Sequence, residues 1–92
     1  MPLTAEQHEV IAALEESRAE LRKVGIPPHM DEGYARHLIE ETADLINVLI
    51  QITFAYPPSP QFKEGVARTR MRVDAFRSMF AEYEPERLRD DD

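Results

Sequence analysis

Apolar residues recur at three- and four-residue intervals along three stretches of the chain, and two proline-containing segments separate these stretches. This spacing is typical of amphipathic helices, and no stretch alternates as a strand would. The pattern therefore predicts an all-α protein with helices over about residues 5–24, 32–55 and 60–83, within one domain spanning residues 1–84. Because the linkers are short, we expect the three helices to form an antiparallel array.

The first predicted helix carries signals at both ends. Thr4, followed three residues later by Gln7, matches the capping-box pattern that satisfies free backbone donors at a helix start. Gly25 is expected to end the helix in a left-handed conformation, with Ile26 packing back on Leu21. One apolar stripe runs between these ends and comprises Val10, Ile11, Leu14, Leu21 and Val24.

The second predicted helix, which Asp31 should cap, carries two apolar ridges. One ridge comprises Tyr34, Leu38, Leu45, Leu49 and Ile52. The other ridge comprises Ile39, Ala43, Ile46, Ile50 and Phe54. A helix that is apolar on so many sides is typically central to its fold, and two flanking helices can hardly cover it. We therefore expect a homodimer that forms a helical bundle, with its interface at Leu45, Val48, Leu49, Ile52 and Tyr56.

The third predicted helix begins with a strong signal, because Ser59 can cap it and Pro60 suits its first position. Its apolar residues repeat at the spacing of a helix–helix seam: Phe62, Val66, Thr69, Val73, Phe76, Phe80 and Tyr83. Pro85 should end the helix, and the charged residues 85–92 are expected to be disordered.

Four other residues on the helices concern packing. Met71 and Met79 are interpreted as filler in the core or at an interface. Gly33 and Gly65 mark either close helix packing or merely flexible positions.

The formal net charge of -7 is unevenly distributed along the chain. Residues 1–46 hold ten acids against four Lys or Arg, and the segment from Glu82 holds six acids against two arginines. Residues 61–80, in contrast, hold five Lys or Arg against two acids. This basic segment indicates either attraction between helices or a phosphate-binding face. The overall charge argues against nucleic-acid binding across the whole surface.

The absence of cysteine and the lengths of the apolar stretches limit the cellular location of the protein and its possible metal sites. There is no cysteine, so disulfides and thiolate metal sites are excluded, and a cytoplasmic location fits this absence. The first residues lack a basic region followed by an apolar run, so we expect no signal peptide. The longest apolar stretch, Leu45 to Tyr56, is too short to span a bilayer.

Polar residues on the second helix form a stripe that could carry chemistry. Glu40, Asp44, Asn47 and Gln51 recur at a spacing that places them on one face, with Glu41 and His37 beside them. A cluster of carboxylates offers the oxygen ligands that Mg²⁺ prefers. The alternative interpretation is a solvated face, in which Asn47 and Gln51 fix the register of a dimer seam.

The segment Glu41–Ile50 resembles the second acidic helix of the all-α nucleotide pyrophosphohydrolases, the MazG-like superfamily, whose pattern is Glu-x-x-Asp opening an apolar helix. In that family a Glu-x-x-Glu on an earlier helix completes the metal site. Here the earlier pair is Glu6 and Glu9. The resemblance thus implies that Glu6, Glu9, Glu41 and Asp44, with Glu40 adjacent, bind Mg²⁺ for hydrolysis of a nucleoside triphosphate. It also implies that phosphate groups are held by arginines of the third helix: Arg68, Arg70 and Arg72.

These observations support three functional hypotheses. The first is a small acidic helical protein–protein interaction module, with an inhibitor, immunity-type or adaptor role, that acts as a homo-oligomer and presents its acidic surface to a basic partner protein. The second is the Mg²⁺-dependent pyrophosphohydrolase implied by the resemblance. The third is nucleic-acid binding through the basic third helix, which the dispersion of its cations around the helix disfavours.

Overall fold

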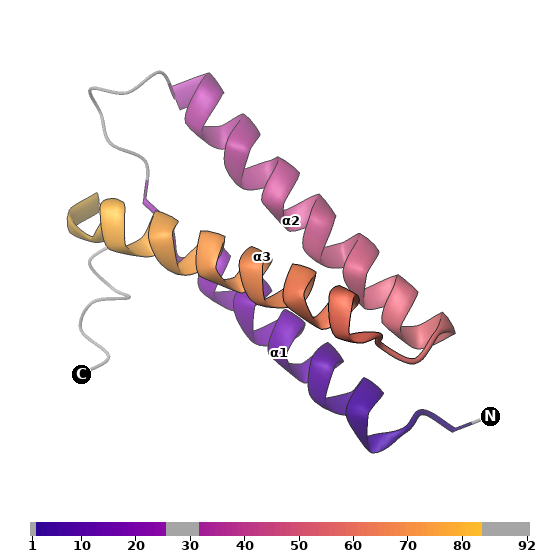
Figure 1. Cartoon of the computed structure of the whole chain (residues 1–92). Coiled ribbons are helices and arrows are strands. Elements are labelled where there is room, and N and C mark those ends of the chain that lie inside the picture. The colour runs from indigo at the N-terminus through magenta and orange to yellow at the C-terminus, as the bar shows by residue number, and fades with distance from the viewer. Residues whose placement is uncertain (1, 26–31, 84–92) are drawn as a thin grey trace.

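The structure is a computed structural model that describes residues 2–25 and 32–83. It contains three α-helices, α1 (Ala5–Leu21), α2 (Glu32–Ala55) and α3 (Pro60–Met79), and a short 3-10 helix, η1 (Ala81–Tyr83). The three α-helices pack together, and the described residues include no strand (Figure 1). The predicted all-α class with three packed helices is confirmed.

The predicted starts of α1 and α3 are also confirmed. The Thr4 hydroxyl accepts a hydrogen bond from the Gln7 backbone N–H at 3.1 Å, and the Gln7 side-chain oxygen accepts one from the Thr4 N–H at 2.8 Å. These reciprocal bonds complete the capping box. At the start of α3 the Ser59 hydroxyl accepts from the Phe62 N–H at 3.1 Å, and Pro60 occupies the first turn.

The end of α1 differs from the prediction. The helix ends at Leu21, and no described glycine has a positive φ, so the expected left-handed stop at Gly25 is wrong. Instead, the N–H groups of Lys23 and Val24 donate to the carbonyls of Glu20 and Leu21, at 3.0 and 3.2 Å. These tighter turns satisfy carbonyls that a left-handed residue would otherwise serve.

Other helix-end predictions are shifted or untested. The third α-helix ends at Met79, and η1 carries the chain through the last residues predicted to be helical. The roles expected of Ile26, Asp31 and Pro85, and the disorder expected of residues 85–92, lie outside the described residues.

The helix that contacts both others most extensively is α1 and not α2, in contrast to the expectation that α2 would be central. One face of α1 is buried, and it comprises Gln7, Ile11, Leu14, Ser17 and Leu21. The contact between α2 and α3 is smaller, and the two helices diverge from the turn that joins them (Figure 1). On α2, part of the apolar surface stays exposed.

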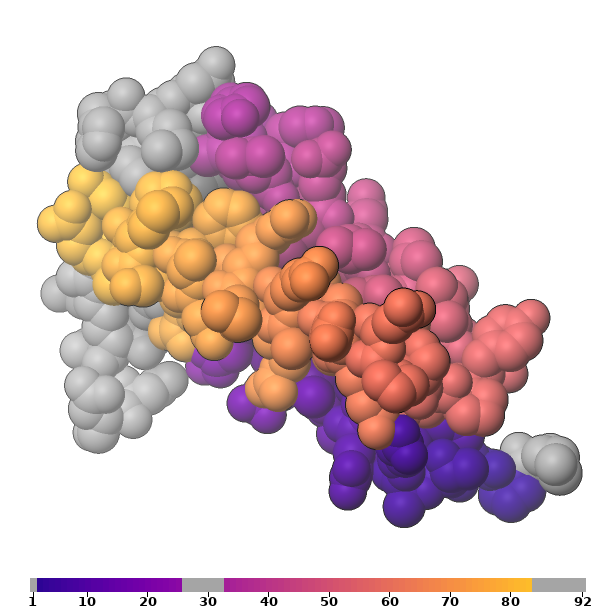
Figure 2. Space-filling model, in the orientation of Figure 1, coloured from indigo at the N-terminus to yellow at the C-terminus, as the bar shows by residue number. Residues whose placement is uncertain are grey.

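The directions of the helices follow from their contacts. The Gln7 side chain donates to the Thr53 carbonyl at 2.8 Å, so the start of α1 lies beside the end of α2, and these two helices run antiparallel. Lys63, Arg70 and Arg77 of α3 contact residues of α1 that rise in the same order, so α1 and α3 run parallel. In the space-filling view α3 lies across the visible face, with α2 above it and α1 below (Figure 2).

The hydrophobic core lies where the three helices meet. It comprises Ile11, Leu14, Leu21, Ile46, Ile50, Val66 and Val73. The ridge of α2 that contains Ile46 and Ile50 therefore faces the core, although Phe54 at its end is exposed. Met71 and Met79 are exposed, so they are not core filler. None of the described helices combines the length and hydrophobicity needed to cross a bilayer.

Candidate functional site

The residues predicted for a dimer interface lie on one flank of α2 or, for Tyr56, directly after its end, and most of them are accessible. Exposed fractions are 38% for Leu45, 51% for Val48, 39% for Ile52 and 66% for Tyr56. Leu49 is half-buried and packs against the core at the edge of this flank. We refer to the four exposed residues, Leu45, Val48, Ile52 and Tyr56, as the α2 stripe.

The α2 stripe faces away from α1. Asn47 marks the side of α2 that α1 covers, because its side-chain oxygen accepts a hydrogen bond from Arg18 at 2.8 Å. Leu45 lies two residues from Asn47, which places it about 200° around the helix, on the opposite side. Within one chain Asn47 thus bonds Arg18, and the interpretation that it bonds across a dimer seam stays a prediction.

The segment of α2 that carries the stripe has no charged residue, which is unusual in this chain. No Asp, Glu, Lys or Arg occurs from Leu45 to Tyr56, although 32% of all residues are charged. At Leu45, Val48 and Ile52 the spacing is three and then four residues, which is the repeat of a helix–helix seam. An exposed seam of this kind can bury apolar area against a second helix without removing a charge from water.

The acidic residues predicted to bind metal are split between different surfaces. Glu40, Glu41 and Asp44 are exposed on α2, and the Glu41 carboxylate lies 3.4 Å from the His37 ring. Glu40 also lines a 170 Å³ pocket between α1 and α2, together with Arg18 and Arg22. That pocket presents both signs of charge and is not a purely acidic site.

The earlier acidic pair lies at the other end of α2. Glu6 and Glu9 line a 280 Å³ groove between α1 and α3, and Glu6 forms an ion pair with Lys63. The neighbouring Gln7 contacts Thr53, which lies nine residues, or about 13 Å of helix, beyond Asp44. Among the residues described, no three His, Asp or Glu side chains are grouped so that they could hold one metal ion. The Mg²⁺ site remains a prediction, and one chain does not bring its two halves together.

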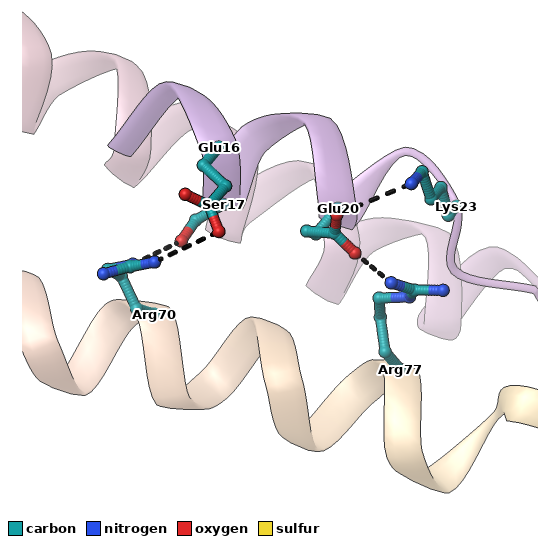
Figure 3. A network of polar contacts seen from close by, with 6 residues as sticks. All are labelled: Glu16, Ser17, Glu20, Lys23, Arg70 and Arg77. Atoms are coloured by element: carbon teal, nitrogen blue, oxygen red, sulfur yellow. Dashed lines mark hydrogen bonds and ion pairs between the residues drawn. The ribbon is translucent and has the colours of Figure 1, made fainter. Parts of the chain in front are cut away.

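The arginines predicted to bind phosphate point in different directions. Arg70 faces α1, where its side chain donates to the Ser17 hydroxyl at 3.0 Å and lies 3.6 Å from the Glu16 carboxylate (Figure 3). Arg68 and Arg72 are exposed, and neither has a hydrogen bond or ion pair within the described part of the chain. They share a face with each other but not with Arg70.

A row of ion pairs joins α1 and α3, and the sequence interpretation did not name its individual partners. Glu20 binds Arg77 and also lies 3.5 Å from Lys23, one turn beyond the Arg70 contacts (Figure 3). A signal was present, because Lys63, Arg70 and Arg77 are spaced by seven residues and so share a face. The basic charge of α3 thus serves, on this face, to attract α1, as one of the two sequence interpretations held.

The contacts therefore define two kinds of surface: a polar one between α1 and α3, and the apolar α2 stripe, which lies outside the core. Comparison with protein-family models, with curated proteins and with solved structures found no match to this chain.

Proposed function

We propose that the protein is a helical protein–protein interaction module that functions as a homodimer, with the α2 stripe as its interface. One observation carries this proposal: three apolar side chains at seam spacing, Leu45, Val48 and Ile52, are each more than a third exposed on the flank of α2 that α1 leaves uncovered. Large contiguous apolar patches on a protein surface mark interaction sites.

A second copy of the chain is the partner that this surface fits. A two-fold interface uses the same patch on both copies, so the patch must be complementary to itself. An uncharged apolar stripe meets this condition, whereas most of the surface of a chain with net charge -7 would repel its own copy. Association through the stripe would extend the core of each chain and compensate for the small core of a 92-residue protein.

Mutation of Ile52 tests the interface against a matched neighbour. Ile52→Glu places a carboxylate in the stripe, and Gln51→Glu adds the same charge one residue away, on the exposed polar face of α2. Burying an unpaired charge is costly, so we expect Ile52→Glu to raise the dimer dissociation constant by about two orders of magnitude. Gln51→Glu, the control, should have nearly the same dimer dissociation constant as the unmodified chain.

Sedimentation equilibrium across a concentration series measures the outcome. The unmodified chain and Gln51→Glu should approach twice the 10.6 kDa chain mass, and Ile52→Glu should remain at the chain mass. Circular dichroism would verify that all three proteins are equally helical. A single-copy species at every concentration, or equal dissociation of the two variants, would refute the proposal.

A further inference from the structure

The α2 stripe is bordered by edges of opposite charge. One edge consists of Arg68 and Arg72 of α3, and we call it the basic edge. The other is formed by Asp44 of α2, and we call it the acidic edge. All three side chains are exposed. How a second copy is oriented decides which edges meet across the interface.

The basic edge lies on the flank of α3 that is turned away from α1. Arg70 points at α1, and Arg68 and Arg72 are each two residues away, which places them about 200° around the helix. Phe76, one turn beyond Arg72, is half-buried against the core on this flank. Because neither arginine is paired within the described chain, both charges are available to a partner.

The acidic edge lies on the other side of the stripe. Leu49 is one turn beyond Leu45 and turns about 40° from it towards the core. Asp44 immediately precedes Leu45 and lies about 100° from it in the opposite direction, away from the core and from α3. Moving around the molecule, one meets the basic edge, then the apolar stripe, then the acidic edge.

The two edges also lie at similar heights along the molecule. Arg72 is twelve residues after Pro60, and Asp44 is eleven residues before Ala55, on either side of the turn that joins α2 to α3. At 1.5 Å per residue both lie about 17 Å from that turn. A second copy aligned in the same direction therefore brings its own Asp44 to the height of Arg72.

From this arrangement we propose that the two copies pack with their α2 helices parallel, so that the basic edge of each copy faces the acidic edge of the other. This inference rests on the proposed dimer. A two-fold axis along the helices brings opposite edges together, whereas an axis across them would place basic against basic and acidic against acidic. The same rule governs flanking charges in coiled coils, which set the orientation of the partner.

Glu41 makes the arginines of the partner necessary in a parallel pair. It lies four residues before Leu45, in register with the stripe, so parallel packing brings the two Glu41 carboxylates towards each other. Arg72 of the opposite copy lies about 3 Å along the helix from that height and supplies the counter-charge. The edges thus specify orientation, and the apolar stripe provides the buried area.

Engineered disulfides test the orientation directly, because the chain has no cysteine of its own. In a parallel pair equivalent residues face each other, so Leu45→Cys and Ile52→Cys should each cross-link with itself under mild oxidation. In an antiparallel pair centred near Val48, neither would do so alone, and a mixture of the two variants would cross-link. Ala12→Cys, on an exposed face of α1, controls for random collision.

Charge removal gives a second, independent readout. Arg72→Gln should raise the dimer dissociation constant about fivefold in the parallel pair, because it removes two symmetric attractions. In an antiparallel pair the same change removes repulsion and would tighten the dimer. Arg22→Gln removes an equal charge from an exposed position on α1 and should change the constant little.

The outcomes separate this inference from the proposed function. Self-cross-linking of both stripe variants, with a weaker Arg72→Gln dimer, supports the parallel arrangement. A stable dimer that cross-links only in the mixture, or that Arg72→Gln tightens, would overturn the arrangement and leave the dimer standing. A chain that remains monomeric at every concentration would refute both the parallel arrangement and the proposed dimer.

Discussion

Among single residues, Gln7 uses its side chain both to cap α1 and to bond α2. It is buried, its oxygen completes the cap of α1, and its nitrogen bonds the Thr53 carbonyl near the end of α2. A buried amide is stable only when its donors and acceptors are paired. Gln7 therefore fixes the register of α1 against α2 at one end of the molecule.

Gly65 shows the opposite case, a residue whose small size the fold does not use. A side-chain carbon added there would meet nothing within 4 Å, so the interpretation of Gly65 as a close-packing position is wrong. Glycine within a helix costs about 0.5–1 kcal/mol relative to alanine. We expect Gly65→Ala to raise the free energy of unfolding by about that amount in urea denaturation. A loss of stability would contradict the open space around this position.

At the scale of elements, the turn before α3 depends on a single hydroxyl. Ser59 accepts a hydrogen bond from the Phe62 N–H, one of the donors that a helix start leaves free. We expect Ser59→Ala to lower the free energy of unfolding by about 0.5–2 kcal/mol. Ser78→Ala, at an exposed position near the end of α3, is the matched control and should be nearly neutral. Equal effects of the two changes would show that the cap contributes nothing.

The starts of the helices could be predicted from sequence, and the end of α1 could not. Thr4, Gln7 and Ser59 act through local bonds, which residue type and spacing specify. At the end of α1 several local solutions satisfy the same carbonyls. Gly25 permits a left-handed residue but does not require one, and the chain instead closes with tighter turns.

Which side of α2 is buried could likewise not be predicted from the spacing of its own apolar residues. Both of its ridges are apolar, so the pattern indicates two faces without saying which one the other helices cover. The choice depends on how α1 and α3 pack, and they bury the ridge with Ile46 and Ile50 in the core. The candidate interface residues could thus be named from sequence, but their exposure required the arrangement of all three helices.

For the whole molecule, the ion pairs between α1 and α3 are partly exposed and should respond to salt. The Glu20 and Arg77 side chains are each 30% exposed, and such pairs contribute about 0.2–1 kcal/mol. We expect Glu20→Gln to lower the free energy of unfolding by about that amount at low ionic strength, and by less at about 1 M salt, where screening is strong. Glu9→Gln, which loses no ion pair within the described chain, is the control. A loss that is independent of salt would point to packing and not to charge.

The position of α1 between its two neighbours has a consequence for how the chain is made. Synthesis begins at the amino end, so the helix that contacts both others most extensively emerges from the ribosome first. When α2 follows, its main neighbour already exists, and the same holds for α3. Each later segment can therefore dock as it appears, and the α2 stripe stays on the outside of the finished chain.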